Sequence, residues 1–180
     1  MSVRLQILCT WCGILSTLIF FIAWWPAAGF FPPHLPSANA DEIVALYRQN
    51  QNGIRTGGIL LIIAGGLYVP FSAALATQIR RMEDRDNPVL SYTELGAGAA
   101  SSVLYTTLGM LWGVAAYRLD RDPQITQALN DLAWFNMFQP AALFMIQCLS
   151  LGIAILCNKN PHQVFPRWFA YFNFWVAFMF

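Results

Sequence analysis

The chain has 180 residues, of which 57% are hydrophobic and 11% are charged, and its formal net charge is +1. Soluble domains carry about 25% charged residues, so this composition excludes an ordinary soluble protein and indicates an integral membrane protein. The small net charge and the lack of a Lys/Arg-rich block give no reason to expect nucleic acid as a partner. The four cysteines lie in apolar runs, unlike the cysteines of a secreted disulfide framework.

The first membrane span is predicted at residues 7–25, a run of 19 residues without a charge. This length suits a helix that crosses about 30 Å of hydrocarbon. An outer loop, residues 26–55, follows this span. Within the loop, Asn39 and Glu42 have the spacing of a helix N-cap and its reciprocal partner, and apolar residues recur over the next two turns. We therefore expect a short amphipathic helix on the membrane surface.

The second and third spans are predicted at residues 56–79 and 95–117. The third span is crowded with glycine, alanine and serine, and small residues let neighbouring membrane helices pack backbone to backbone. Within it, Gly109 and Gly113 form a Gly-x-x-x-Gly pair that permits a close crossing. We therefore expect the third span to be the central helix.

The fourth helix is predicted to begin outside the bilayer, because Asp122 suits an N-cap and Pro123 suits the first helical position. Its membrane span is placed at residues 132–157. Pro140 lies inside this range and is expected to bend the helix.

The fifth span is predicted at residues 166–180, and from 165 to 180 nine of 16 residues are Phe, Tyr or Trp. About 15 residues make roughly 22 Å of helix, so we expect a span cut short at the C-terminus. Trp168, Phe172 and Trp175 have the spacing of one helical face. We predict that this aromatic face meets a further helix, a partner chain or a flat apolar ligand.

Together these elements predict an all-α fold, a polytopic transmembrane helical bundle in a single domain, 1–180. It has four full spans plus a fifth, aromatic-rich span. Lys and Arg set the orientation, because the cytoplasmic side normally holds more of them. One side collects Arg4, Arg80, Arg81, Arg85, Lys159 and Arg167, and the other collects Arg48, Arg55, Arg118 and Arg121. The N-terminus is therefore expected in the cytoplasm, with the protein in the bacterial inner membrane.

Polar side chains share faces of the third and fourth spans at about 100° per residue. The candidate residues are Glu94, Ser101, Tyr105 and Trp112 on the third span, and Asn136, Gln139, Gln147 and Ser150 on the fourth. Two interpretations stay open. The stripes either join helices by hydrogen bonds or line a cavity for an amphiphilic ligand.

Glu94 is the acid nearest to a predicted span, and ionisable residues inside spans are candidates for function. Ser91 and Glu94 also have the Ser-x-x-Glu spacing of a capping box, which predicts a structural role at the start of the third helix. Cys9 and Cys12 have the spacing of a redox pair but stand among apolar residues, so we interpret them as small buried hydrophobes.

No metal or cofactor is expected. His34 and His162 are predicted on opposite sides of the membrane, and neither has a second ligand at metal-binding spacing. The outer loops gather charged residues whose arginines are interpreted as ion-pair partners of the loop carboxylates, or as a grip on a lipid headgroup. They are Asp41, Glu42, Arg48, Arg55, Arg118, Asp120, Arg121, Asp122 and Asp131.

Three segments resemble a group of uncharacterised small multi-pass bacterial inner-membrane proteins. They are Gly29-Phe30-Phe31-Pro32-Pro33, the turn from Arg118 to Pro123, and Phe165-Pro166-Arg167-Trp168. The resemblance supports the helical fold and implies no activity. It also implies at least one more helix after the Pro-Arg-Trp segment.

The sequence thus predicts a non-catalytic integral membrane protein, an auxiliary or scaffold subunit that binds other membrane helices and lipid. The alternative is a small membrane-embedded enzyme or binding protein for an apolar metabolite. No catalytic residue stands out. Expected partners are membrane lipid, further membrane protein subunits, or an apolar small molecule.

Overall fold

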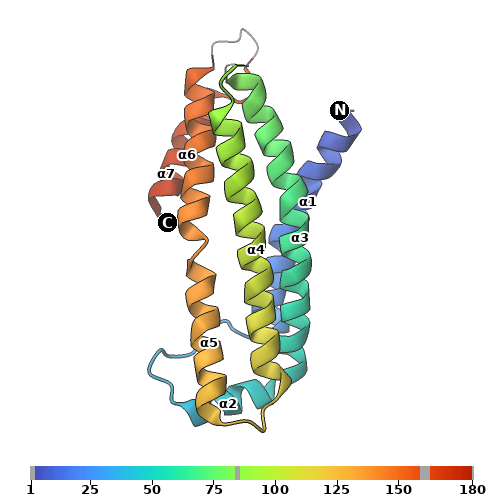
Figure 1. Ribbon diagram of the computed structural model, residues 1–180, viewed down its shortest axis with the longest axis vertical. Helices are drawn as coiled ribbons and strands as arrows, with labels where there is room; N and C mark the ends of the chain where they lie inside the picture. The colour runs from blue at the N-terminus through green and yellow to red at the C-terminus, as the bar shows by residue number, and fades with distance from the viewer. Residues whose placement is uncertain (1–2, 84–85, 159–162, 180) are drawn as a thin grey trace. The chain divides into compact units, whose positions relative to one another are not determined.

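The computed structural model describes residues 3–83, 86–158 and 163–179 (Figure 1). Over these ranges the chain is helical and no β-strand occurs. The helices are α1 (Val3–Ile22), α2 (Ala40–Gln49), α3 (Gln51–Met82), α4 (Val89–Tyr117), α5 (Pro123–Phe138), α6 (Ala141–Cys157) and α7 (Arg167–Met179). A π-helical turn, η1 (Ala23–Ala27), continues α1 through Pro26.

Four helical segments are long and apolar enough to cross a membrane, namely Val3–Ala27, Gln51–Met82, Val89–Tyr117 and Pro123–Cys157. The predicted all-α fold with four spans is therefore confirmed, as is the short aromatic-rich helix α7 that follows them. Each long helix extends beyond its predicted apolar core because polar residues at its ends continue the helical hydrogen bonding. The chain is a multi-pass membrane protein by this criterion.

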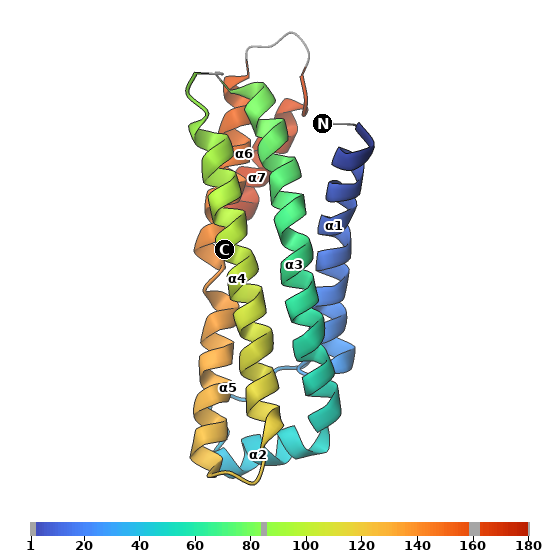
Figure 2. The ribbon, with the colours of Figure 1, turned by 45° about the vertical axis from the view of Figure 1, so that its right-hand side comes forward.

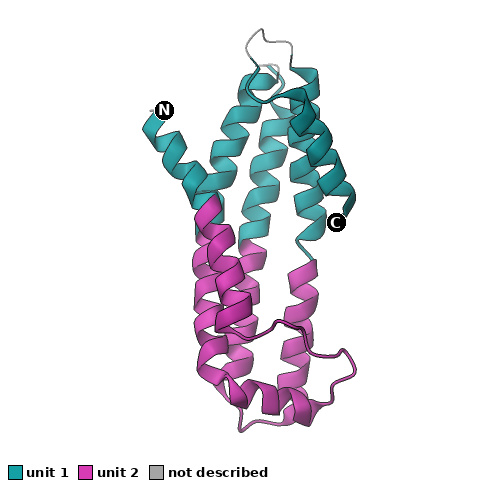
Figure 3. Cartoon of the chain, turned by 180° about the vertical axis from the view of Figure 1, so that it is seen from behind, with its two compact units in different colours: residues 1–13, 67–102, 139–180 teal, residues 14–66, 103–138 magenta. Residues whose placement is uncertain are grey.

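The residues group into two compact units (Figure 3). Unit 1 comprises residues 1–13, 67–102 and 139–180, and unit 2 comprises residues 14–66 and 103–138. The helices α1, α3 and α4 contribute residues to both units, whereas α5 belongs to unit 2 and α6 and α7 belong to unit 1.

In unit 2 the core is an aromatic cluster around Phe30, Trp112 and Trp134. The ring centroids of Phe30 and Trp112 are 4.6 Å apart, and those of Trp112 and Trp134 are 5.9 Å apart. Gly29 has a φ of 70°, a left-handed conformation that glycine adopts without strain. It turns the chain out of η1 and places Phe30 in the core, where only 1% of its surface stays exposed.

The short helix α2 is confirmed, together with its capping box. The Asn39 side chain accepts from the Glu42 amide, and the Glu42 carboxylate accepts from the Asn39 amide, both at 3.0 Å. The apolar side of α2 is buried, and the Tyr47 hydroxyl donates to Asn130 Oδ1 on α5 at 3.2 Å. Asp122 also caps as predicted, because its Oδ1 accepts from the Gln124 amide at 2.9 Å just after Pro123.

Helix α4 lies between its neighbours in both units, with α3 on one side and α5 or α6 on the other (Figures 1 and 2). In unit 2, a Cβ at Gly58 would lie 2.6 Å from the carbonyl oxygen of Gly109, so the two backbones touch. The predicted central position of this glycine-rich helix therefore agrees with its packing. Gly113 differs from Gly109, because a Cβ there would meet nothing within 4 Å.

The predicted capping box of Ser91 and Glu94 is wrong. Helix α4 begins at Val89, and the carboxylate of Glu83 accepts from the Leu90 amide at 2.9 Å and from the Ser91 amide at 3.1 Å. An acid from the end of α3 thus satisfies the first amides of α4, which have no partner within the helix. Glu94 lies one turn further on and is fully buried.

Three outer arginines of unit 2, Arg48, Arg55 and Arg121, bind backbone carbonyls rather than the loop carboxylates, which corrects the ion-pair interpretation for these three. Arg48 donates to Leu119 O at 3.0 Å, and Arg55 donates to Ala116 O and Tyr117 O at 3.1 and 2.8 Å. Arg121 reaches two further carbonyls there. The last carbonyls of a helix lack helical partners and carry partial negative charge, so guanidinium groups stabilise this end of α4.

Candidate functional site

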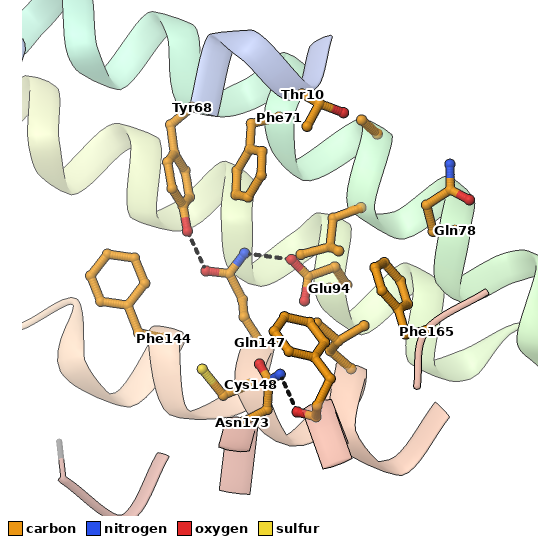
Figure 4. A pocket seen from close by; sticks show the side chains of 14 residues that line it. Thr10, Tyr68, Phe71, Gln78, Glu94, Phe144, Gln147, Cys148, Phe165 and Asn173 are labelled. Carbon is orange, nitrogen blue, oxygen red and sulfur yellow. Dashed lines mark hydrogen bonds between the residues drawn. The ribbon is translucent and has the colours of Figure 1, made fainter. Parts of the chain in front are cut away.

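A cavity of about 380 Å³ opens within unit 1 (Figure 4). Its walls come from α1, α3, α4, α6 and α7 and from the segment before α7, and they are largely apolar. The lining residues are Thr10, Tyr68, Phe71, Ala74, Leu75, Gln78, Glu94, Phe144, Gln147, Cys148, Leu151, Phe165, Phe169 and Asn173. Small-molecule sites are usually apolar hollows of this kind with a few polar groups.

A chain of hydrogen bonds crosses one wall of the cavity (Figure 4). The Tyr68 hydroxyl on α3 donates to Gln147 Oε1 on α6 at 2.9 Å. The Gln147 amide in turn donates to Glu94 Oε1 on α4 at 2.7 Å. Gln147 therefore joins the two other helices and uses both ends of its amide to do so.

Two polar atoms at this wall have no partner among the described residues. They are Glu94 Oε2 and Ser72 Oγ, and both side chains are fully buried. A buried polar group without a hydrogen bond is costly, and a buried carboxylate without a counter-charge is more so. None of the described residues that line the cavity is Lys, Arg or His. The described lining thus has one acidic group, and its second oxygen has no hydrogen-bond partner among the described residues.

Gly98 brings the three helices together next to this chain. A Cβ at Gly98 would overlap the Ser72 hydroxyl and would lie 3.0 Å from Gln147 Nε2. Gly98 follows Glu94 by one helical turn, so the missing side chain leaves room for Ser72 and Gln147 beside α4. The small-residue character of the third span therefore shapes the site as well as the packing.

Aromatic rings form much of the remaining wall. Tyr68 lies 5.7 Å from Phe71 and 6.0 Å from Phe144 between ring centroids, and Phe165 lies 5.5 Å from Phe169. These rings come from three different helices and from the segment before α7. They line the same cavity as Glu94, and the faces of such rings carry partial negative charge.

The structure divides the predicted polar stripes. Glu94 and Gln147 meet at the cavity, and Asn136, Tyr105 and Trp112 lie in unit 2 instead. There Asn136 donates to Leu104 O at 2.9 Å, Tyr105 packs on Phe20, and Trp112 belongs to the aromatic core.

The other stripe residues do not line the cavity. Ser101 is buried and donates to Ala97 O at 2.9 Å within α4, and Ser150 is buried on α6. Gln139 is exposed at the break between α5 and α6, where Pro140 interrupts the helix. The fourth span is thus two helices rather than one bent helix, because proline lacks the amide that would continue the ladder.

The aromatic face predicted on the last helix lies outside the cavity. Trp168, Phe172 and Trp175 are 65%, 48% and 58% exposed, and the rings of Phe172 and Trp175 are 6.2 Å apart. The opposite side of α7 supplies Phe169 and Asn173 to the cavity wall. A partner for the exposed face stays a prediction.

Three residues of the site were not singled out from the sequence, namely Tyr68, Ser72 and Gly98. Tyr68 and Ser72 are four positions apart on an otherwise apolar stretch of α3, and this spacing puts both on one helical face. That pair is the signal in the sequence that points to a polar side of α3. Gly98 has no such signal, because it is one of many small residues in α4.

Comparison of the chain with protein-family models, with curated proteins and with solved structures finds no match. Among the described residues no group of three or more His, Cys, Asp or Glu side chains gathers in a way that could hold a metal ion. Inference about function therefore rests on the cavity itself.

Proposed function

We propose that the protein is a non-catalytic membrane protein that binds an apolar or amphiphilic small molecule in the cavity of unit 1. The observation that carries this proposal is the fully buried Glu94, which lines a largely apolar cavity and whose Oε2 has no hydrogen-bond partner among the described residues. An apolar hollow binds by burial of hydrocarbon, and one polar group then orients the ligand. The sequence analysis gave as its alternative a small membrane-embedded enzyme or binding protein for an apolar metabolite, and the proposal takes the binding protein.

The test is to fill the cavity. Ala74 lines it and is 4% exposed, so Ala74→Leu adds a bulky side chain where a ligand would lie. The matched control is Ala99→Leu on the exposed side of α4. Mild extraction followed by mass spectrometry should find a small molecule with the wild type and with the Ala99→Leu control, and lose it in Ala74→Leu. Equal recovery from all three chains would contradict the proposal.

The auxiliary-subunit function is a second proposal, supported by the exposed rings of Trp168, Phe172 and Trp175 on α7. Aromatic side chains bring large contact areas and dominate many protein interfaces. A photo-reactive amino acid at Trp168 should cross-link a protein chain in the native membrane, whereas the same probe at the exposed Val103 of α4 should cross-link lipid alone. Lipid adducts at both positions would argue against a partner on this face.

We also propose that the protein lies in the bacterial inner membrane with its N-terminus in the cytoplasm, supported by the Lys and Arg count. Two of the residues counted, Arg85 and Lys159, lie outside the described residues. Single cysteines at the exposed positions Asn87 and Asp120 should label differently with an impermeant reagent in intact cells. Asp120 is expected to be the accessible position, and labelling of Asn87 alone would invert the orientation.

A further inference from the structure

The polar groups of the cavity differ in whether they can still form a hydrogen bond with a ligand. Each hydroxyl and amide group of the described lining already donates to a protein acceptor. Thr10 donates to Gln6 O, Gln78 to Gln6 Oε1, Asn173 to Phe169 O, Tyr68 to Gln147 and Gln147 to Glu94. Glu94 Oε2, by contrast, accepts no hydrogen bond from the described residues. A ligand that complements this site therefore carries a hydrogen-bond donor for Glu94 Oε2.

The charge of the site also favours a ligand that brings a hydrogen-bond donor. Among the described residues that line the cavity, Glu94 is the only acidic one and none is basic. A buried carboxyl group needs a proton or a cation to offset its charge, because water does not solvate it there. An ionised Glu94 repels an anionic ligand group, and the negative faces of the aromatic rings disfavour such a group as well.

The aromatic walls favour a cation over a neutral donor. The rings of Tyr68, Phe71 and Phe144 form one contacting group in the wall, and those of Phe165 and Phe169 form a second. A cation near the face of such a ring is attracted by the ring quadrupole, most strongly where water is excluded. A neutral alcohol gains the hydrogen bond to Glu94 without this attraction.

We infer that the cavity selects cationic amphiphiles, in which an ammonium group pairs with Glu94 Oε2 and an apolar body lies against the aromatic rings. This inference rests on the proposed function, since it names the class of ligand for the same cavity. No covalent bond forms between the ligand and the protein, and a proton that leaves Glu94 passes to the solvent. The cation takes the place of the proton or counter-charge that otherwise offsets Glu94.

The test compares three probes of one shape, 4-tert-butylbenzylammonium, 4-tert-butylbenzyl alcohol and 4-tert-butylbenzoate. Binding to the full-length protein is measured by calorimetry in an uncharged detergent. We expect the ammonium probe to bind at least about tenfold more tightly than the alcohol, as a desolvated cation–π contact and ion pair would give, and the benzoate to bind weakest. In Glu94→Gln the ratio of ammonium to alcohol affinity should fall close to one.

Two further outcomes separate the inference from the proposed function. If the alcohol binds as tightly as the ammonium probe or more tightly, the cavity binds apolar molecules but does not select cations, and the inference fails alone. If no probe binds the wild type, both fail. Phe144→Leu provides a second variant that keeps Glu94 and tests the inference if Glu94→Gln fails to fold. It keeps an apolar wall and should weaken the ammonium probe more than the alcohol, and an equal effect on both probes would overturn the role given to the rings.

Discussion

Gly58 on α3 and Gly109 on α4 meet backbone to backbone. A Cβ added to either glycine would collide with the carbonyl oxygen of the other. Backbone oxygens cannot rotate aside as a side chain can, so the contact fixes how closely these helices approach in unit 2. In lipid, where apolar surface gains little by leaving the solvent, such close packing is a main source of helix association.

Gly109→Ala should therefore destabilise the protein, although alanine favours helix over glycine by roughly 1 kcal/mol. The added methyl group must push α3 away, and overpacking of this kind costs about 1–3 kcal/mol. Gly113→Ala is the matched control four residues later, where nothing lies within 4 Å of the added Cβ. Thermal melting in detergent should show a lower midpoint for Gly109→Ala and an equal or higher one for Gly113→Ala. Equal midpoints would show that the crossing tolerates a side chain.

Gln147→Leu should lower the stability of the protein by about 1–3 kcal/mol, because Glu94 Oε1 loses its donor inside the protein. The control is Gln78→Leu, since Gln78 is half-buried and its bond to Gln6 is long at 3.3 Å. Denaturation in detergent measures both variants. A loss for Gln78→Leu as large as that for Gln147→Leu would contradict a special role for the chain of hydrogen bonds.

His34 should make the protein sensitive to acid. Burial lowers the pKa of His34 below its ordinary value of 6.5, against a smaller opposing effect of Asp131. The Asn130 amide lies 3.1 Å from His34 Nε2, and an amide donor needs the neutral imidazole as acceptor. Since the unfolded chain takes up the proton more readily, the contribution of neutral His34 is complete above pH 6.5 and is lost as the pH falls through the lowered pKa.

The measurement is the melting temperature between about pH 8 and about pH 5. His34→Gln keeps an acceptor near Asn130 and removes the titration, so its melting temperature should change less over this interval. A variant that follows the wild-type curve throughout would mean that other groups cause the acid sensitivity.

Arg55→Leu should lower stability more than Arg118→Leu. Arg55 gives two hydrogen bonds to the last carbonyls of α4, and bonds from charged donors contribute about 1.5–3 kcal/mol at best, less at a partly exposed site. Arg118 is exposed, and its guanidinium lies over the Tyr117 ring at 5.7 Å. Melting of the two variants in one detergent compares them directly, and a larger loss for Arg118→Leu would reverse the assignment.

The rate at which Cys148 is modified can show whether a ligand occupies the cavity, because Cys148 is the cysteine that lines it. In a chain whose other cysteines are replaced by alanine, a small thiol-reactive compound should modify Cys148, and 4-tert-butylbenzylammonium should slow the reaction. Cys157, kept as the single cysteine in a second chain, is exposed and should react at the same rate with and without the probe. Slowing at both positions would indicate an effect of the probe on the detergent.

The sequence predicted the parts of this fold that depend on near neighbours. Asn39 and Glu42 form their capping box because both partners lie within one turn. Ser91 and Glu94 have a similar spacing and do not, since Glu83 takes the first amides of α4 and Gln147 holds Glu94 from 53 positions away. Local spacing cannot show which of two available acids reaches an amide, or which helix will pack beside it.

The candidate site was predictable to the same extent. Glu94 and Gln147 were recognised because polar residues are conspicuous in apolar spans, but their pairing depends on how α4 and α6 pack. Arg48, Arg55 and Arg121 were expected to pair with carboxylates, but their acceptors are backbone carbonyls. Every residue has a carbonyl, so no pattern of side chains marks those acceptors in advance.

In these arginine contacts the donor depends on the identity of a residue, whereas the acceptor does not. The donors Arg48 and Arg55 are specified by their side chains, and few other residues offer the same reach and geometry. The acceptors at positions 116, 117 and 119 are specified only by the helical path of the backbone. Evolutionary drift can therefore exchange the residues at the end of α4 while the arginines stay fixed. Natural variants of this chain should show that asymmetry.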